Sequence, residues 1–237
     1  MIYLTGDTHG RFNHVAAFCS RFNTTTDDLL VILGDAGINY YGGPKDRRLK
    51  EVLCQLPITL LSIHGNHEKR PEKQPSYQEA ELFGGVVYQE PDFSNLLFAK
   101  DGEIYELEGK RCVVIGGAYS VDKFYRLNYG AGWWPDEQPS AEIKERVKRR
   151  LEDENWNVDI VLSHTCPYKY VPREAFLPFI DNDSVDNSTE EWLDAIEEKL
   201  TYSRWYCGHY HIEKIIDNIR FLYNDFITIS PSDGEAP

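Results

Sequence analysis

Five short apolar runs in the chain are each followed directly by a segment containing Asp, Asn or His. The runs lie at 2–4, 29–33, 58–63, 158–162 and 205–207. Runs of this length and composition are typical of buried strands. The carboxyl ends of parallel strands meet at one edge of an α/β sheet, where ligands usually bind. The pattern therefore predicts a sheet with a polar site along one edge.

Helical spacing of apolar residues follows several of these runs. It predicts helices at 10–22, 46–56, 141–155 and 188–200. The first third of the chain thus reads strand–helix–strand–helix–strand, with connections long enough for parallel pairing. In the second helix, the inward positions are expected to be Leu49, Val52, Leu53 and Leu56, and the outward ones Lys45, Arg47, Arg48 and Lys50.

The middle of the chain has a different pattern. Short β-type runs occur at 86–88, 96–99, 103–107 and 111–115, and a further pair occurs at 212–216 and 219–223. Asp101-Gly102, Glu108-Gly109 and Asp217-Asn218 are typical hairpin turns. We therefore expect the parallel half to give way to a mostly antiparallel half.

Two irregular segments, 116–140 and 166–186, separate the later elements. The first is rich in Tyr, Trp and Gly, which argues against disorder and favours a lid or a packed loop over a surface for a partner. Ser140 is expected to cap the helix that follows it. Without a repeat or a linker, the simplest interpretation is one domain over 1–229 and a flexible tail over 230–237.

Composition and charge narrow the function classes. The 237 residues are 41% hydrophobic and 27% charged, which is typical of a globular domain. A net charge of −14 disfavours broad binding to nucleic acid, although it does not exclude a local basic patch. No apolar run approaches the ~20 residues of a membrane span. With no signal-like start and five unpaired-looking cysteines, the chain is expected to be cytoplasmic, without membrane contact.

The polar residues after the runs form a set of metal donors. Two carboxylates, one amide and four imidazoles are expected at one edge: Asp7, His9, Asp35, Asn66, His164, His209 and His211. Seven donors exceed the needs of one closed tetrahedral zinc site and suit two ions that share a carboxylate. Mn, Fe, Zn or Co fit mixed oxygen and nitrogen donors better than Ca or Mg.

Two such ions can generate hydroxide near neutral pH and hold a phosphoryl group for in-line attack. His67 then remains beside the site, where an imidazole can protonate a leaving alkoxide. Arg47 and Arg126 are weak candidates for contact with phosphate, and each is more often an ordinary surface residue. His14 and His64 are interpreted as structural. Each motif alone is weak, because Gly-Asp and Gly-Asn are common turn dipeptides; their joint occurrence carries the hypothesis.

Together the motifs resemble the five signature blocks of the calcineurin-like metallophosphoesterase superfamily. The blocks are Gly6-Asp7-Thr8-His9-Gly10, Gly34-Asp35, Gly65-Asn66-His67-Glu68, Ser163-His164 and Gly208-His209-Tyr210-His211. The resemblance implies an α/β fold, a four-layer α/β/β/α sandwich of two mixed sheets flanked by helices. It implies one metal held by Asp7, His9, Asp35 and His211. It implies a second metal held by Asp35, Asn66, His164 and His209, with Asp35 bridging and His67 catalytic.

One departure bears on the substrate. Protein Ser/Thr phosphatases extend the second block to GDxxDRG, whereas Asp35 is followed here by Ala36-Gly37-Ile38-Asn39. The leading hypothesis is a dinuclear-metal-dependent phosphoesterase that hydrolyses phosphomonoesters or small phosphodiesters through a metal-bridging hydroxide. Its alternatives are a metallonuclease acting on DNA or RNA, a phosphoprotein phosphatase, and a non-enzymatic interaction module. The natural substrate, the preference for mono- or diesters, the native metals and the oligomeric state are left open.

Overall fold

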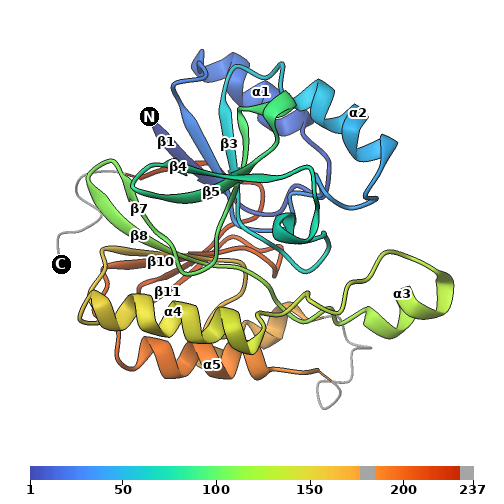
Figure 1. Cartoon of the computed structure of the whole chain (residues 1–237). Coiled ribbons are helices and arrows are strands. Elements are labelled where there is room, and N and C mark those ends of the chain that lie inside the picture. The colour runs from blue at the N-terminus through green and yellow to red at the C-terminus, as the bar shows by residue number, and fades with distance from the viewer. Residues whose placement is uncertain (177–184, 230–237) are drawn as a thin grey trace.

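Two mixed β-sheets lie face to face between two pairs of helices (Figure 1). The structure is a computed structural model and describes residues 1–176 and 185–229. The expected tail at 230–237, and part of the second irregular segment, lie outside the described residues. In the described part of the chain, no helix combines the length and apolar character needed to cross a bilayer.

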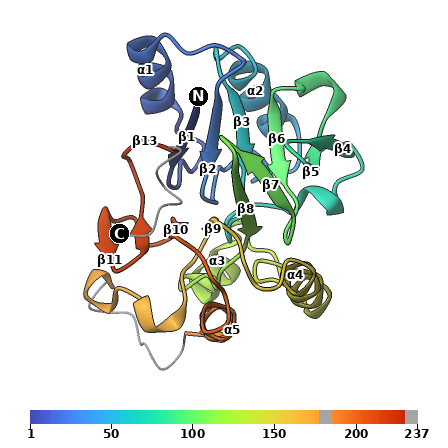
Figure 2. The ribbon, with the colours of Figure 1, turned by 90° about the vertical axis from the view of Figure 1, so that its left-hand side faces the viewer.

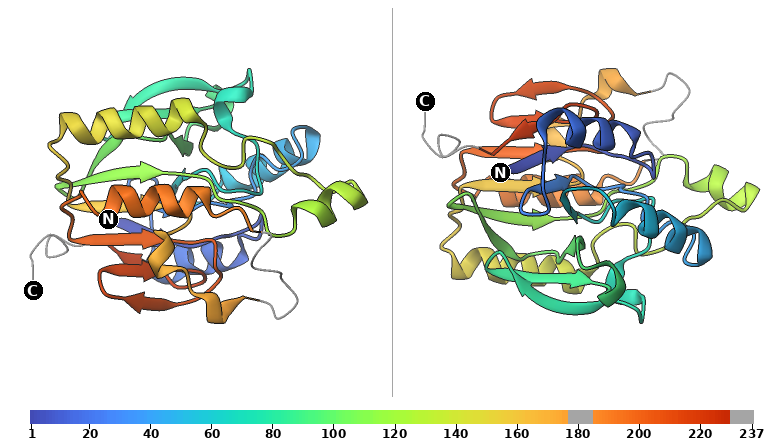
Figure 3. Two further views of the ribbon diagram at one scale, coloured as in Figure 1. Left: turned by 90° about the horizontal axis from the view of Figure 1, so that it is seen from below. Right: turned by 90° about the horizontal axis from the view of Figure 1, so that it is seen from above.

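The first sheet has the order β13-β1-β2-β3-β6-β5-β4. Its four central strands run in parallel: β1 (Ile2–Thr5), β2 (Leu29–Ile32), β3 (Thr59–Ser62) and β6 (Leu96–Ala99). Antiparallel strands complete its edges: β13 (Ile227–Thr228), β5 (Gly85–Gln89) and β4 (Gln78–Leu82). The outer face is covered by α1 (Asn13–Phe22) and α2 (Pro44–Leu53), as the view from above shows (Figure 3).

The second sheet has the order β11-β12-β10-β9-β8-β7. Its strands are β7 (Ile104–Leu107), β8 (Lys110–Ile115), β9 (Ile160–Ser163), β10 (Arg204–Cys207), β11 (Lys214–Ile216) and β12 (Ile219–Phe221). The helices α4 (Ala141–Asp153) and α5 (Ser188–Glu197) cover its outer face (Figure 2). Short 3-10 turns lie at Pro71–Lys73, Pro91–Phe93, Tyr168–Tyr170 and Arg173–Ala175.

Three apolar layers hold these four layers of structure together. The layer between the sheets includes Leu4, Val31, Leu97, Val114 and Leu162, all essentially without solvent contact. A second layer packs the first sheet against α1 and α2, and a third packs the second sheet against α4 and α5. Burial of apolar area is the main favourable term in folding, so these layers stabilise the arrangement. The order of helices and sheets confirms the four-layer α/β/β/α sandwich predicted from the sequence.

The strand pairing corrects two expectations. The runs in the middle of the chain pair antiparallel as expected, β5 with β6 and β7 with β8, but the second sheet is mostly parallel, because β8, β9, β10 and β12 pair in parallel. The turn at Asp101-Gly102 does not close a hairpin, since it carries the chain from β6 in the first sheet to β7 in the second. The Asp101 carboxylate accepts hydrogen bonds from Arg70 (2.7 Å) and from the backbone N–H of Gly116 (2.6 Å), which fixes this crossing. The other two turns, Glu108-Gly109 and Asp217-Asn218, do close hairpins.

The orientation of α2 also differs from the expectation. Val52, expected inside, is 66% exposed, whereas Lys50, expected outside, is 5% exposed. The helix begins at Pro44, whose fixed φ suits a first helical turn, rather than at Asp46. Lys50 is buried because its ammonium meets the half-buried Glu90 carboxylate at 2.5 Å. A partner from a distant segment therefore decides which face of α2 turns inward.

The aromatic segment 116–140, expected to be an irregular loop, includes a helix. It contains α3 (Lys123–Tyr129), which projects from the body of the molecule at the right of Figure 1. Ser140 caps α4 as predicted, with its hydroxyl accepting the N–H of Ile143 at 3.3 Å. None of the five cysteines forms a disulfide.

Candidate metal centre

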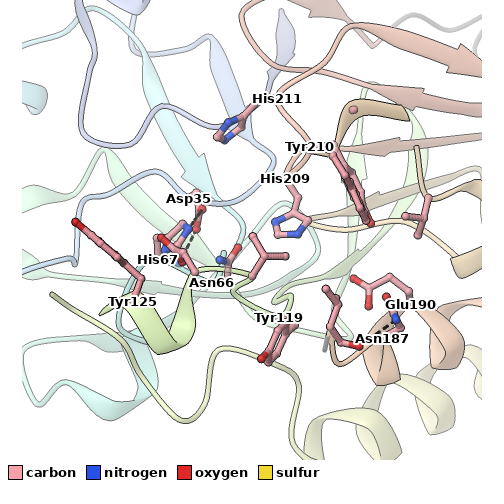
Figure 4. A pocket seen from close by; sticks show the side chains of 16 residues that line it. Asp35, Asn66, His67, Tyr119, Tyr125, Asn187, Glu190, His209, Tyr210 and His211 are labelled. Carbon is pink, nitrogen blue, oxygen red and sulfur yellow. Dashed lines mark hydrogen bonds and ion pairs between the residues drawn. The ribbon is translucent and has the colours of Figure 1, made fainter. Parts of the chain in front are cut away.

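The seven predicted donors come from the carboxyl ends of five strands. The register pairs Thr5 with Ile32 and Ile32 with Ser62 in the first sheet, so three strands end level with one another. In the second sheet Ser163 pairs with Cys207 in the same way. Because the two sheets face each other, these ends bring the donors close together; Figure 4 shows four of them, Asp35, Asn66, His209 and His211.

One group of donors surrounds Asp7. Its Oδ2 lies 3.2 Å from His211 Nε2 and 3.7 Å from His9 Nε2. The two imidazole nitrogens are themselves 2.9 Å apart. All three residues offer donor atoms within 4.8 Å of one another, a spacing that suits one metal ion.

A second group joins Asp7 and Asp35 to His164. His164 Nε2 lies 3.8 Å from Asp35 Oδ1 and 2.8 Å from Asn66 Oδ1. His209 is placed beside this group, with its ring centroid 4.9 Å from that of His164. The structure therefore brings all seven predicted donors together.

The hydrogen bonds around His164 test whether these donors fit a cation. His164 Nδ1 faces the Leu33 carbonyl at 2.8 Å, and a carbonyl only accepts, so Nδ1 carries the proton. In the neutral ring Nε2 then presents a lone pair. Asn66 uses its amide N–H to bond Ser120 and presents its Oδ1 to that lone pair at 2.8 Å. Two acceptors face one another, an arrangement that a cation between them satisfies.

Backbone N–H groups hold the two carboxylates in place. His209 N–H donates to Asp7 Oδ1 and His67 N–H donates to Asp35 Oδ1, both at 2.8 Å. Each bond fixes one oxygen and leaves Oδ2 directed toward neighbouring imidazoles. Four predicted donors have left-handed backbone, His9, Asp35, His209 and His211, with φ between 47° and 65°. Such strain in non-glycine residues is concentrated at functional sites.

Three glycines that the sequence analysis placed in the motifs, but to which it gave no role, make this packing possible. A Cβ on Gly65 would lie 2.0 Å from Asp35 Oδ1, and one on Gly208 would lie 2.3 Å from Asp7 Oδ1. A Cβ on Gly34 would lie 1.9 Å from His164 Nδ1. The sequence could have indicated this role, because each of these glycines directly precedes a donor in a GD, GN or GH motif.

Burial and charge set the ionisation of the centre. Although burial acts in the opposite direction, the hydrogen bond from His211 and the nearby imidazoles hold the pKa of Asp7 well below its usual range. Burial, reinforced by the neighbouring His164, lowers the pKa of His209 and favours its neutral, ligating form. Burial next to Asp35 raises the pKa of Glu68 to about 8.

His67 lies at the edge of the donor groups. Its Nε2 is 3.9 Å from Asp35 Oδ2 and 3.5 Å from the Arg126 guanidinium. Burial is the largest cause that lowers the pKa of His67. Arg126 is itself held by Asp122 at 2.8 Å and by the hydroxyl of Tyr40 at 3.2 Å.

The other residues considered from the sequence lie elsewhere. Arg47 bonds Asp92 at 3.1 Å and Glu51 at 3.3 Å, and it lines a hollow of about 540 Å³ that shares no lining residue with the metal centre's pocket. His14 packs beside Phe226 at the outer face of the first sheet.

The centre opens into a pocket of about 670 Å³ (Figure 4). Metal donors and His67 line one part of the pocket. The rest is lined by residues of the aromatic segment, of the second irregular segment, of the start of α5 and of the loop after β10: Tyr119, Val121, Asp122, Tyr125, Val171, Ala175, Phe176, Val185, Asn187, Glu190 and Tyr210.

Solved structures with a similar fold include phosphopantetheinyl hydrolase from Mycobacterium tuberculosis. It is 15% identical, with a TM-score of 0.51, and the match covers 100% of this chain and 98% of that one. A protein of Thermus thermophilus matches at 11% identity and a TM-score of 0.47, over 87% and 80% of the two chains. A protein of unknown function from Aquifex aeolicus matches at 16% identity and a TM-score of 0.34, over 72% and 81%. No curated protein sequence matches the chain.

The family comparison is more direct than these distant likenesses in structure. The family description calcineurin-like phosphoesterase matches residues 1–213, which include every predicted donor. Members of this family usually depend on two metal ions, and the Asp and His groups described above could bind them. The chain therefore belongs to the calcineurin-like phosphoesterases and is a metal-dependent phosphoesterase.

Proposed function

We propose that the protein is a dinuclear-metal-dependent hydrolase of phosphomonoesters or small phosphodiesters. The observation that carries this proposal is the meeting of two Asp/His donor groups at the inner end of a pocket large enough for a small ester. Pockets of a few hundred Å³ with a few convergent polar groups are typical of small-molecule sites. The substrate is thus a small phosphate ester.

The donors divide into two ligand sets. Asp7, His9, Asp35 and His211 hold one ion, and Asp35 with three further donors, Asn66, His164 and His209, holds the other. The placement of Asp35 supports its bridging role, because Oδ1 lies 3.8 Å from His164 and Oδ2 lies 3.9 Å from His9. Asp7 belongs to both close groups and therefore lies near both sets. Two divalent ions there supply positive charge for a phosphoryl group and lower the pKa of water.

The protein's own groups complete the site. His67 is the proton donor to the leaving oxygen, since it lies beside the donors and lines the pocket. Arg126 orients this imidazole from 3.5 Å, while its guanidinium is held by Asp122 and Tyr40 and is not among the described residues that line the pocket. The half-buried position of both residues limits competition from water.

The test is hydrolysis of p-nitrophenyl phosphate and of bis(p-nitrophenyl) phosphate by protein loaded with Mn²⁺. His67→Asn is expected to lower kcat by about 100-fold or more while metal content stays at two ions, because general acid catalysis typically contributes that much. His14→Asn, a histidine change distant from the centre, is the matched control and should leave kcat unchanged. Absence of turnover of both esters by the metal-loaded protein, or full activity in His67→Asn, would contradict the proposal.

Charge argues against the nuclease alternative. The chain carries −14, and no lysine or arginine is among the described residues that line the pocket. Cleavage of single-stranded oligonucleotides faster than of small esters would favour it instead. A phosphopantetheinyl ester belongs in the same substrate panel because of the name of the Mycobacterium tuberculosis protein, whose likeness concerns the fold alone.

A further inference from the structure

Beyond the metal centre, the side chains that line the pocket are predominantly apolar and aromatic. They are Tyr119, Val121, Tyr125, Val171, Ala175, Phe176, Val185 and Tyr210. The rings of Phe176 and Tyr210 lie nearly parallel, at 10°, with centroids 6.3 Å apart. Such walls bind apolar or ring-shaped groups by burial of their surface.

Carboxylates are the charged groups of this outer part. Asp122 is already neutralised by its hydrogen bonds to Arg126. Glu190 forms no ion pair within 4 Å among the described residues, although Lys144 and His164 lie close enough to interact with its charge. An anionic leaving group would be repelled by these carboxylates, so the walls disfavour it.

The Glu190 carboxylate is buried, and one of its two oxygens lacks a hydrogen-bond partner among the described residues. It lies in the first turn of α5 and is 4% exposed. Its Oε1 accepts a hydrogen bond from the Thr165 hydroxyl at 2.7 Å. Its Oε2 has no hydrogen-bond partner among residues 1–176 and 185–229. Burial raises the pKa of Glu190, which agrees with a carboxyl group that is short of partners.

The position of Glu190 relates it to a bound ester. It lines the same pocket as Asp35 and His67, and it lies on the opposite side of His209 from both (Figure 4). Tyr119 borders the space between them (Figure 4). A leaving group that extends from the metal centre over these rings therefore reaches Glu190.

We propose that Glu190 selects the leaving group of the substrate. The favoured ester, given the phosphoesterase activity proposed above, has an apolar leaving group with a ring, uncharged or cationic, and carries a hydrogen-bond donor that meets Glu190 Oε2. An unsatisfied buried acceptor costs free energy, and a donor from the substrate removes that cost. A substrate without the donor leaves it in place, so the pocket discriminates between the two.

A purely structural role makes a different prediction. If Glu190 serves only to hold Thr165 and the start of α5, its replacement changes stability and affects all substrates alike. If it selects the leaving group, its replacement changes the ratio between substrates. The ratio is therefore the decisive measurement.

Three phenyl phosphates provide the probe, with a 2-aminoethyl, a propyl or a carboxymethyl group para to the ester. The ammonium is a donor, the propyl group is a neutral match in length, and the carboxylate is an anion. In the wild-type protein loaded with Mn²⁺, kcat/KM is expected to be at least about tenfold higher for the ammonium ester than for the propyl ester, as befits a hydrogen bond to a charged group. The carboxylate ester should be the poorest substrate.

Glu190→Gln is the test variant and Glu191→Gln is the control. In Glu190→Gln the amide oxygen can still accept from Thr165, which leaves the amide N–H₂ facing the ligand's donor. The ratio of ammonium to propyl ester should therefore fall about tenfold. Glu191 is exposed on the same helix, and its replacement changes the net charge equally, so the ratio should persist.

The outcomes separate the two proposals. Hydrolysis of all three esters without preference, or an equal loss of preference in both variants, overturns the role of Glu190 while the phosphoesterase proposal stands. Failure of the metal-loaded protein to hydrolyse any of them overturns the phosphoesterase proposal, and the role of Glu190 with it. If Glu190→Gln does not fold, the order of the three esters in the wild-type protein decides.

Discussion

Gly65 occupies a position where a side chain has no room, and its replacement by alanine tests how the metal centre is built. A Cβ there would lie 2.0 Å from Asp35 Oδ1 and 2.2 Å from the Asp35 backbone nitrogen. Ordinary van der Waals contact begins at 3.4 Å, so the atoms must separate by 1.4 Å (3.4 minus 2.0). Because one of them belongs to the backbone, rotation of the Asp35 side chain alone cannot relieve the clash.

The expected cost follows from that displacement. Overpacking a rigid site costs about 1–3 kcal/mol. Movement of Asp35 also weakens its hydrogen bond from the His67 N–H (2.8 Å), and a bond to a charged group is worth about 1.5–3 kcal/mol. We expect a loss near 3 kcal/mol in the free energy of unfolding, which for a chain of this size lowers Tm by roughly 6–12 °C.

Thermal unfolding by circular dichroism and metal content by elemental analysis measure the two effects. Gly43→Ala is the control, because a Cβ at Gly43 meets nothing within 4 Å and its φ of −170° suits any residue. Gly65→Ala should unfold earlier and bind less metal, whereas Gly43→Ala should match the wild type within about 1 kcal/mol. Wild-type Tm and full metal content in Gly65→Ala would refute the view that glycine is required there for close approach to Asp35.

Four further predictions concern the charged and buried groups. Asp35→Asn should reduce metal content below one ion per chain, since Asp35 is proposed to bridge, and two retained ions would contradict the bridge. Removal of the ions with EDTA should lower Tm, by an amount equivalent to about 2.7 kcal/mol for each ion that is present at 100 times its Kd; an unchanged Tm would contradict it. Lys50→Ala should cost about 3 kcal/mol because it leaves the half-buried Glu90 without its partner, and Lys50→Met with Glu90→Leu should recover much of that loss; urea unfolding would measure both. Burial lowers the pKa of His14, so the folded protein favours the neutral imidazole. Its contribution to the free energy of unfolding is complete above about pH 6.5 and is lost as pH falls below that value. The free energy of unfolding of His14→Asn should therefore decrease less than that of the wild type between pH 7.5 and pH 5.

The strands of the centre could be predicted from the sequence because their signal is local. An apolar run ending at Gly-Asp or Gly-Asn indicates a strand end, and parallel register places such ends at one edge. Asp35 and Asn66 were found in this way, and His164 was found from the Ser-His that ends another apolar run. The helix face of α2 was predicted wrongly at Val52 and Lys50, because the Glu90 carboxylate that buries Lys50 lies forty residues later in the chain.

The pairing of strands is a second limit of the sequence. Asp101-Gly102 has the composition of a hairpin turn, yet it joins the two sheets. Turn residues specify local backbone geometry, not the partner of the next strand. That partner depends on contacts such as the one between Asp101 and Arg70, which join segments thirty-one residues apart.

Glu190 had a signal that was available but not used. It stands three residues before Leu193 and six before Ile196, on the buried face of α5. An acidic residue on an apolar helix face indicates either a buried partner or a ligand. The hydrogen bond that it accepts from Thr165 satisfies only one of its two oxygens. The second oxygen therefore supports the interpretation that Glu190 meets a ligand.

Strain and electrostatics at the centre have a common explanation. His9 and His211 have left-handed backbone, which costs about 1–3 kcal/mol for each such residue. Their Nε2 atoms lie 2.9 Å apart beside the buried Asp7 carboxylate. His164 and Asn66 likewise present two acceptors to each other at 2.8 Å. Protein groups alone leave the two acceptors of His164 and Asn66 unsatisfied, whereas a cation satisfies them, so the strain around these donors is that of a centre able to hold metal.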